Sequence, residues 1–211
     1  MDFELMLKYV HNVLKENNAI KPKKPTQFFR SRITHTYRVY EWAKRIAPDR
    51  PNCNKDILFT AAIFHDSGYA IGKENHAAYS AKIFKSYAEK NNFDKEFTDE
   101  VVRIIALHSD KSLLKKEDTS DELVLLLEAD LLDEEGAMGI VWDLLSQGYQ
   151  GCDNYEAALD ALWIHSSHIL NQDYMVTPIA KKYWEEKKEL VRNFIKNLES
   201  DLFLGRKLYE D

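Results

Sequence analysis

The sequence has little of what β-sheet folds require. Glycine and proline account for only 7 and 5 of the 211 residues, which is about half of their usual share. Such a shortage of turn-forming residues argues against a turn-rich β-sandwich or barrel. No segment alternates apolar and polar residues over the length of a strand. These absences favour long helices.

Cysteine and long apolar runs are scarce as well. Cys53 and Cys152 are too few for a disulfide framework or a Cys-based zinc site. No apolar run approaches the roughly 18 residues of a membrane-spanning helix, and residues 1–4 carry acids where a secretory signal carries bases. We therefore expect a cytoplasmic protein without a membrane segment. A chain of this length buries roughly 70% of its unfolded surface, so one domain spanning 1–211 can form its own core.

The net charge of −6 disfavours a general nucleic-acid coat, so no extended nucleic-acid partner is expected. The charge is uneven, however. Residues 21–50 hold nine Lys or Arg against two acids, whereas residues 117–135 hold nine acids and no base. Most of these charges fit solvated helix faces, but the basic segment could also attract a small anionic ligand such as a phosphate ester.

Apolar residues recur with a helical period along most of the chain. Capping residues set several of the expected ends: Asn54 caps the third helix, Thr98 caps the fifth, and Thr119 with Glu122 forms a capping box for the sixth. The expected helices cover about 2–18, 30–47, Asn54 to just before Gly68, 75–91, Thr98 onward, 120–134, 137–147, 154–169 and 178–204. This pattern predicts an all-α, single-domain protein.

Five of these helices direct an ionisable residue along the apolar face that should enter the core. They carry, in chain order, His35, His65 followed at once by Asp66, His76, His108 and Asp130. An unpaired carboxylate in an apolar setting costs many kcal/mol, and a neutral imidazole needs a partner for each nitrogen. Several such groups near one another can offset this cost together by binding one shared cation. The other histidines, His11, His165 and His168, have no matching carboxylate stripe and are expected to be structural.

The recurrence of His35, His65-Asp66 and Asp130 resembles the H…HD…D pattern of the HD-domain metal-dependent phosphohydrolase superfamily. The surrounding segments "SRITHTYRVYEWAKRIA", "DILFTAAIFHDSGY", "NHAAYSAKIF", "VVRIIALHSD" and "LLLEADLLDEEGAMGI" are similar to that superfamily too. The last segment resembles the D-A-D-x-L-D-x-x-G-A-x-G-I stretch of small, stand-alone bacterial HD hydrolases, some of which are nucleotide pyrophosphohydrolases. It departs from that stretch at Glu128, which replaces Asp. The resemblance covers about residues 26–145.

The resemblance implies a helical HD fold in which His35, His65, Asp66 and Asp130 bind a divalent metal. His76 and His108 add two candidate ligands beyond the minimal pattern. Members with six ligands hold two metals, and some of these are phosphodiesterases whereas a few are di-iron oxygenases. One ion is therefore expected here and two are allowed. The ligand types accept Mn, Fe, Co, Ni, Mg or Zn.

For hydrolysis of a phosphate ester or anhydride by metal-activated water, other side chains receive roles as hypotheses. Asp66 could also orient the water, and Glu74 is the candidate general acid or base. Arg38, Lys73 and Lys111 are candidates for binding the substrate phosphate. Asp133, one turn after Asp130, is expected to orient a ligand.

The expected substrate is a small phosphorylated molecule, and a nucleotide is favoured. A nucleoside triphosphate, a nucleoside monophosphate, a cyclic dinucleotide and a non-nucleotide phosphate all stay open, as does the oligomeric state. Two other functions compete. A di-iron oxygenase would use His76 and His108 as additional iron ligands, and a non-catalytic helical binding module would keep the fold without a reactive metal.

Overall fold

The computed structural model describes residues 1–203, and every regular element in this range is a helix. The α-helices are α1 (Phe3–Glu16), α2 (Arg32–Ile46), α3 (Lys55–Phe64), α4 (His76–Lys90), α5 (Lys95–Leu107), α6 (Asp121–Glu134), α7 (Ala137–Tyr149), α8 (Tyr155–Ile164) and α9 (Pro178–Phe203). The short 3-10 helices are η1 (Pro25–Gln27), η2 (Ala47–Asp49), η3 (Ser67–Ala70), η4 (Lys111–Lys115) and η5 (Ser166–Asn171). The all-α prediction is confirmed. Residue 204 of the predicted last helix, like the domain end at 204–211, lies outside the described residues.

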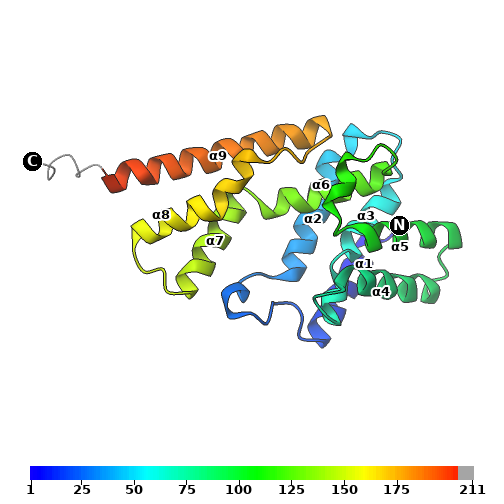
Figure 1. Cartoon of the computed structure of the whole chain (residues 1–211). Helices are drawn as coiled ribbons and strands as arrows, with labels where there is room; N and C mark the ends of the chain where they lie inside the picture. Colours follow the sequence, from blue (N-terminus) through cyan, green and yellow to red (C-terminus); the bar gives the residue numbers. More distant parts are fainter. Residues whose placement is uncertain (204–211) are drawn as a thin grey trace, which may run out of the picture.

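Three helices form the centre of the molecule. α2 packs against α3 and α6, and α3 also packs against α6. α6 is buried without interruption from Leu123 to Asp133, which is the pattern of a core helix rather than a surface helix. α1, α4 and α5 lie on one side of this centre, and α7, α8 and the long α9 lie on the other (Figure 1). The motif-bearing helices therefore meet in the interior.

The predicted start of the fifth helix was wrong. α5 begins one turn earlier than Thr98, because Asp94 caps it and accepts a hydrogen bond from Phe97 N at 3.0 Å. The Thr98 hydroxyl instead donates to the Asp94 carbonyl at 2.7 Å, inside the first turn. Asp94 and Thr98 are both residue types that commonly cap helices, so the local sequence alone does not tell which of them precedes α5.

The predicted capping box of the sixth helix was wrong too. Ser120 caps α6, with Leu123 N donating to its hydroxyl at 3.4 Å. The Thr119 hydroxyl donates to Leu113 O at 2.7 Å, and Glu122 accepts from Asn54 N at 2.7 Å. Both members of the expected box thus bind elsewhere, Thr119 to the preceding turn and Glu122 to a segment that is distant in the sequence. The predicted helix 154–169 also divides, into α8 and η5.

Gly68 lies where the chain after α3 touches the start of α4. A Cβ at this position would be 2.0 Å from His76 O and 2.5 Å from Ser80 N. The absent side chain lets Gly68 N donate to Ser80 Oγ at 2.7 Å. Only glycine permits this approach, which holds the His65-Asp66 corner beside the helix that begins at His76.

Glu128 connects α6 to the segment that precedes α9. Its fully buried carboxylate accepts hydrogen bonds from Val176 N at 2.6 Å, Thr177 N at 2.9 Å and Thr177 Oγ1 at 2.6 Å. This use explains a carboxylate two residues before Asp130 in an otherwise apolar helix. At this position the chain therefore has Glu where the family stretch has Asp, which is also an acid but has a side chain shorter by one methylene group.

Candidate metal centre

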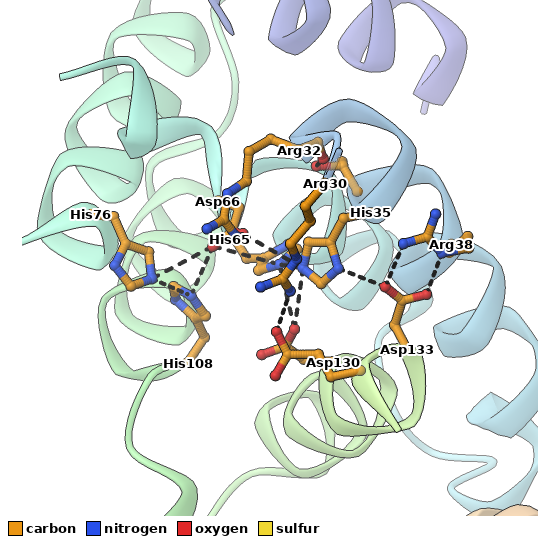
Figure 2. A network of polar contacts seen from close by, with 12 residues as sticks. Arg30, Arg32, His35, Arg38, His65, Asp66, His76, His108, Asp130 and Asp133 are labelled. Atoms are coloured by element: carbon orange, nitrogen blue, oxygen red, sulfur yellow. Dashed lines mark hydrogen bonds and ion pairs between the residues drawn. The ribbon is translucent and has the colours of Figure 1, made fainter. Parts of the chain in front are cut away.

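Four imidazoles and two carboxylates, which come from α2 and α6 and from the ends of α3, α4 and α5, meet in one cluster (Figure 2). His35 lies in α2 and Asp130 in α6, whereas His65 and Asp66 directly follow α3. The remaining two are His76, the first residue of α4, and His108, the residue after α5. Apart from the half-buried His76, all of these side chains are buried. The structure therefore brings together the six residues that the sequence singled out.

Three of the imidazoles are oriented by the backbone. The Nδ1 atoms of His65 and His108 lie 2.7 Å from the carbonyls of Ala62 and Ile105, and Nδ1 of His76 lies 3.0 Å from Lys73 O. A carbonyl can only accept, so each Nδ1 carries the proton and donates. The Nε2 lone pair of each ring then points toward the cluster, as in a metal-ligating histidine.

His35 is oriented by a carboxylate instead. Its Nδ1 lies 2.7 Å from Asp133 Oδ2, and Arg38 grips the same carboxylate with Nε at 2.6 Å and Nη2 at 3.0 Å. Figure 2 shows Asp133 between His35 and Arg38. A carboxylate behind a histidine fixes the ring and increases its basicity as a ligand.

The inward-facing atoms form two groups that share Asp66. In one, His35 Nε2 lies 3.3 Å from His65 Nε2, 3.5 Å from Asp66 Oδ2 and 3.3 Å from Asp130 Oδ1. In the other, Asp66 Oδ1 lies 3.5 Å from His76 Nε2 and 3.6 Å from His108 Nε2. Ligands that each lie about 2.1 Å from one ion are about 3.0–3.4 Å apart in tetrahedral or octahedral geometry. Both groups are close to this spacing.

The buried histidines differ in how readily they take up a proton. Burial opposes a charge on His35, but hydrogen bonds with Asp130 and Asp133 raise its pKa from 6.5 to about 9. Burial lowers the pKa of His65 to about 4 and also lowers the pKa of His76. Without a metal, His35 therefore carries a positive charge near pH 7, whereas His65 is neutral.

The carboxylates stay ionised despite their burial. Burial favours the neutral acid, but His65 and other neighbours, including Arg32, hold the pKa of Asp66 well below its usual range. The Lys111 ammonium does the same for the pKa of Asp130. Ionised oxygens and free Nε2 lone pairs are the forms that bind a divalent cation. The donor set therefore fits such an ion.

Comparison with known proteins agrees with this geometry. A family model described as the HD domain matches residues 32–135, the range that holds all six residues. The uncharacterized protein YpgQ of Bacillus subtilis (strain 168) is 30% identical over 174 residues, which cover 80% of this chain and 82% of YpgQ. The chain belongs to the HD-domain superfamily.

Solved structures share the HD-domain fold of this chain. An HD-superfamily hydrolase from Bacillus thuringiensis superposes with a TM-score of 0.70 at 20% identity, covering 95% of this chain and 96% of that one. The crystal structure of Bacillus subtilis YpgQ in complex with ADP has a TM-score of 0.66 at 22% identity, with 94% of each chain covered. At these identities the likeness shows the fold.

The HD-domain cluster opens into a cavity of about 190 Å³. Lys111 lines this cavity, with its Nζ 2.5 Å from Asp130 Oδ2. The other predicted phosphate-binding residues lie elsewhere: Arg38 is bound to Asp133, and Lys73 lines a neighbouring hollow. Glu74 is exposed and is not among the residues that line the cavity.

Five further side chains line the cavity of this HD domain and were not singled out from the sequence. They are Arg30, Arg32, Tyr69, Ser109 and Glu134. Arg32 donates to Asp66 Oδ2 at 3.0 Å, and Arg30 pairs with Glu134. Helical spacing was the available signal for two of them. Arg32 lies three residues before His35 and Glu134 four after Asp130, which puts each on the face of its ligand.

The remaining histidines lie outside the groups of ligand atoms found among the described residues. His165 contacts Gln147, and His168 contacts Glu135 at 3.0 Å. His11 lies on α1. Within residues 1–203, moreover, every helix falls short of the length or the apolar character that crossing a bilayer demands.

Proposed function

We propose that this HD-domain protein is a metal-dependent phosphohydrolase that acts on a nucleotide. The observation that carries the proposal is that five of the six clustered metal-type donors, all except the buried His65, line a cavity that is also lined by Arg30, Arg32 and Lys111. Cations beside a metal site suit a phosphate group, whose negative charge both can bind.

His35, His65, Asp66 and Asp130 would hold the first divalent ion, and Asp66, His76 and His108 could hold a second. When bound, a divalent metal supplies Lewis-acid polarisation of a phosphoryl oxygen and makes water more acidic. The residues of the chain supply position and charge. Asp133 and Arg38 keep His35 in place, so we propose Arg38 as a positioning residue rather than a substrate ligand.

The cationic side chains would bind the phosphoryl group itself. The Lys111 ammonium and the guanidinium groups of Arg30 and Arg32 line one cavity, where they offset the charge of phosphoryl oxygens as the bond breaks. Glu134 is the half-buried carboxylate in this cavity, so we propose it in place of Glu74 as the residue that accepts or donates a proton.

Nucleotide specificity has separate support. YpgQ, which is 30% identical, has been crystallised with ADP, a nucleoside diphosphate. A cytoplasmic setting belongs to the same proposal, since Cys53 and Cys152 are free thiols and a nucleotide substrate is found in the reducing interior of a cell.

A di-iron oxygenase is the second candidate, because Asp66 Oδ1 contacts both His76 and His108 as a second iron site requires. Two measurements separate the candidates. Protein purified without chelator is analysed for metals. Phosphate release from nucleotides and phosphomonoesters is then measured with added manganese alongside oxygen uptake, with pyrophosphatase present so that released pyrophosphate is also counted. Phosphate release without oxygen uptake supports the hydrolase. Oxygen uptake without phosphate release would replace it with the oxygenase, and inactivity of metal-loaded protein over the whole panel would favour a binding module.

The matched variant for this test is Asp66→Asn. It keeps the shape of the side chain but removes the charge shared by both groups of ligand atoms. We expect loss of bound metal and of at least about 99% of phosphate release, with the helical circular-dichroism signal retained. Asp118→Asn, an exposed change of the same type, serves as the control. An active Asp66→Asn protein would contradict the proposal. Asp66→Ala is a less clean test, because it leaves the buried Arg32 unpaired at a cost of about 3–5 kcal/mol.

A further inference from the structure

A second hollow adjoins the metal cavity. It has a volume of about 230 Å³ and lies between the end of α1, the loop leading to η1 and the turn between η3 and α4. Arg32 and Tyr69 line both hollows. The two hollows therefore adjoin at these two side chains.

The second hollow is strongly positive. Its basic residues are Lys21, Lys23, Lys24, Arg32 and Lys73, and we call it the cationic groove. None of the described residues that line it is an acid. Among the ion pairs found in the described part of the chain, none involves any of the four lysines. Arg32 is paired with Asp66, but the four lysines are gathered in a concave surface without such a counter-charge, and this arrangement attracts anions.

Arg32 links the groove to the metal centre. Its side chain is buried, donates to Asp66 Oδ2 at 3.0 Å and stacks over the Tyr69 ring at 3.6 Å. Its Nε is buried and has no hydrogen-bond partner among the described residues. A buried donor without a partner destabilises the fold, so an acceptor oxygen bound at this junction would recover that free energy.

We infer that the cationic groove binds the non-reacting phosphates of a substrate with a phosphoanhydride chain, while the reacting phosphoryl group lies at the metal centre. The inference rests on the proposed phosphohydrolase function and narrows its substrate. A phosphomonoester carries its charge on one phosphorus and fills only the metal cavity. A di- or triphosphate spans both hollows, and each further phosphate adds charge that the lysines can bind.

The test replaces the three loop lysines together, as Lys21→Gln, Lys23→Gln and Lys24→Gln. These side chains lie at the surface of a loop, so folding should be preserved, and circular dichroism checks this. The control removes the same charge from exposed positions on α9, as Lys181→Gln, Lys182→Gln and Lys196→Gln. The two variants have the same net charge, so a difference between them reports the position of the charge.

The first readout needs no activity. Binding of inorganic tripolyphosphate to chelator-treated protein is measured by calorimetry at two salt concentrations. We expect the groove variant to bind about tenfold more weakly than both the wild type and the α9 control, since about 1.4 kcal/mol is lost. We also expect a weaker salt dependence, because fewer charges contact the anion. Equal binding by the groove variant and the α9 control would overturn the inference.

The second readout compares substrates. The loss of kcat/KM in the groove variant should be about tenfold larger for a nucleoside triphosphate than for its monophosphate, and it should lie in KM. An equal loss for both substrates would overturn the inference without affecting the proposed hydrolase. If the wild type releases no phosphate from any substrate, the proposed function fails, and tripolyphosphate binding alone then decides whether the groove binds phosphate chains. A substrate arm with inorganic tripolyphosphate distinguishes a free polyphosphate from a nucleotide.

Discussion

An imidazole serves a metal well when an acceptor holds its second nitrogen, and His35 obtains this acceptor from Asp133. The Asp133 carboxylate is in turn held by two hydrogen bonds from Arg38. Arg38 thus acts on the cluster through two intermediaries, since it does not line the metal cavity. Loss of the guanidinium would let Asp133 rotate and free the His35 ring.

We therefore expect Arg38→Gln to weaken manganese affinity by about 10- to 100-fold, measured by calorimetry on chelator-treated protein. Arg38→Lys should restore little of it, because an ammonium cannot make the paired contact of a guanidinium. Arg192→Gln removes an exposed arginine from α9 and provides the control. Full manganese affinity in Arg38→Gln would show that Asp133 holds His35 unaided.

His35 also determines a pH dependence of the metal-free protein. Its pKa is raised to about 9 in the fold from 6.5, so the protonated ring is favoured by folding. This contribution is fully present below about pH 6.5 and is lost as the pH rises through about 9, and the difference corresponds to about 3 kcal/mol.

The matched comparison uses His35→Gln, which cannot titrate. The free energy of unfolding by urea is measured for both chelator-treated proteins from about pH 6 to about pH 10. We expect the stability of the wild type to fall relative to the variant over this range. His65, whose pKa is lowered to about 4 in the fold, gains a proton only on unfolding, so it raises the stability of both proteins as the pH rises from about 6 and cancels in the difference between them. Two parallel curves would mean that His35 gains no proton on folding.

At the scale of elements, the contact between η3 and α4 depends on one missing side chain. A Cβ on Gly68 would collide with the backbone of His76 and Ser80, and neither backbone can move alone. Gly68→Ala should therefore push η3 away from α4 and separate Asp66 from His76. We expect a loss of about 1–3 kcal/mol, the usual cost of overpacking, together with weaker metal binding.

Gly148→Ala is the control for this substitution. Gly148 lies in α7, and beyond the backbone of its own helix nothing comes within 4 Å of the point that an alanine Cβ would occupy. Alanine there should be neutral or should stabilise the helix by up to about 1 kcal/mol. Thermal unfolding of both variants compares the two sites. Equal melting temperatures would mean that the η3–α4 contact yields without cost.

Elements were more predictable from the sequence than their ends. The helix α6 itself was predictable, because its eleven successive buried residues need a helix to pair their backbone hydrogen-bonding groups. The residue that caps α6 was not predictable in this way. Glu122 accepts from Asn54, which lies 68 residues away, and no local pattern reports such a partner. The earlier start of α5, which is capped by Asp94, likewise depends on a choice between cap residues that local preference leaves open.

The candidate site shows the same division at the scale of the whole molecule. The inward-facing ligands of the site were predictable, because an ionisable residue on an apolar helix face needs a partner, such as a shared cation, to offset the cost of its burial. The roles of the surrounding charges were not, since Lys73 and Glu74 are neighbours in one loop and only the packing of η3 and α4 decides that Lys73 lines the cationic groove whereas Glu74 lines neither hollow. Arg38 lies one turn after His35, and this spacing predicts a phosphate ligand; its partner Asp133 is 95 residues further along the chain, which local spacing does not reveal.

The attachment of the C-terminal helices to the metal-bearing half rests partly on Glu128. Its carboxylate satisfies two backbone N–H groups and one hydroxyl just before α9, and burial raises its pKa. Glu128→Ala would leave these donors without an acceptor, at about 1–3 kcal/mol for each of the two buried donors of Thr177 and less for the partly buried Val176 N. Glu128→Gln keeps an acceptor oxygen for the two N–H groups and avoids burying a charge, so it should retain most of the stability.

The two variants separate the hydrogen bonds from the charge. We expect Glu128→Ala to lower the free energy of unfolding by about 2–5 kcal/mol and to speed amide exchange first in α9, which contacts α6. Glu128→Gln should stay within about 1 kcal/mol of the wild type, because its amide can donate to the Thr177 hydroxyl oxygen once that hydroxyl turns. Equal losses in both variants would mean that the negative charge, rather than the acceptor geometry, joins the two halves of the molecule.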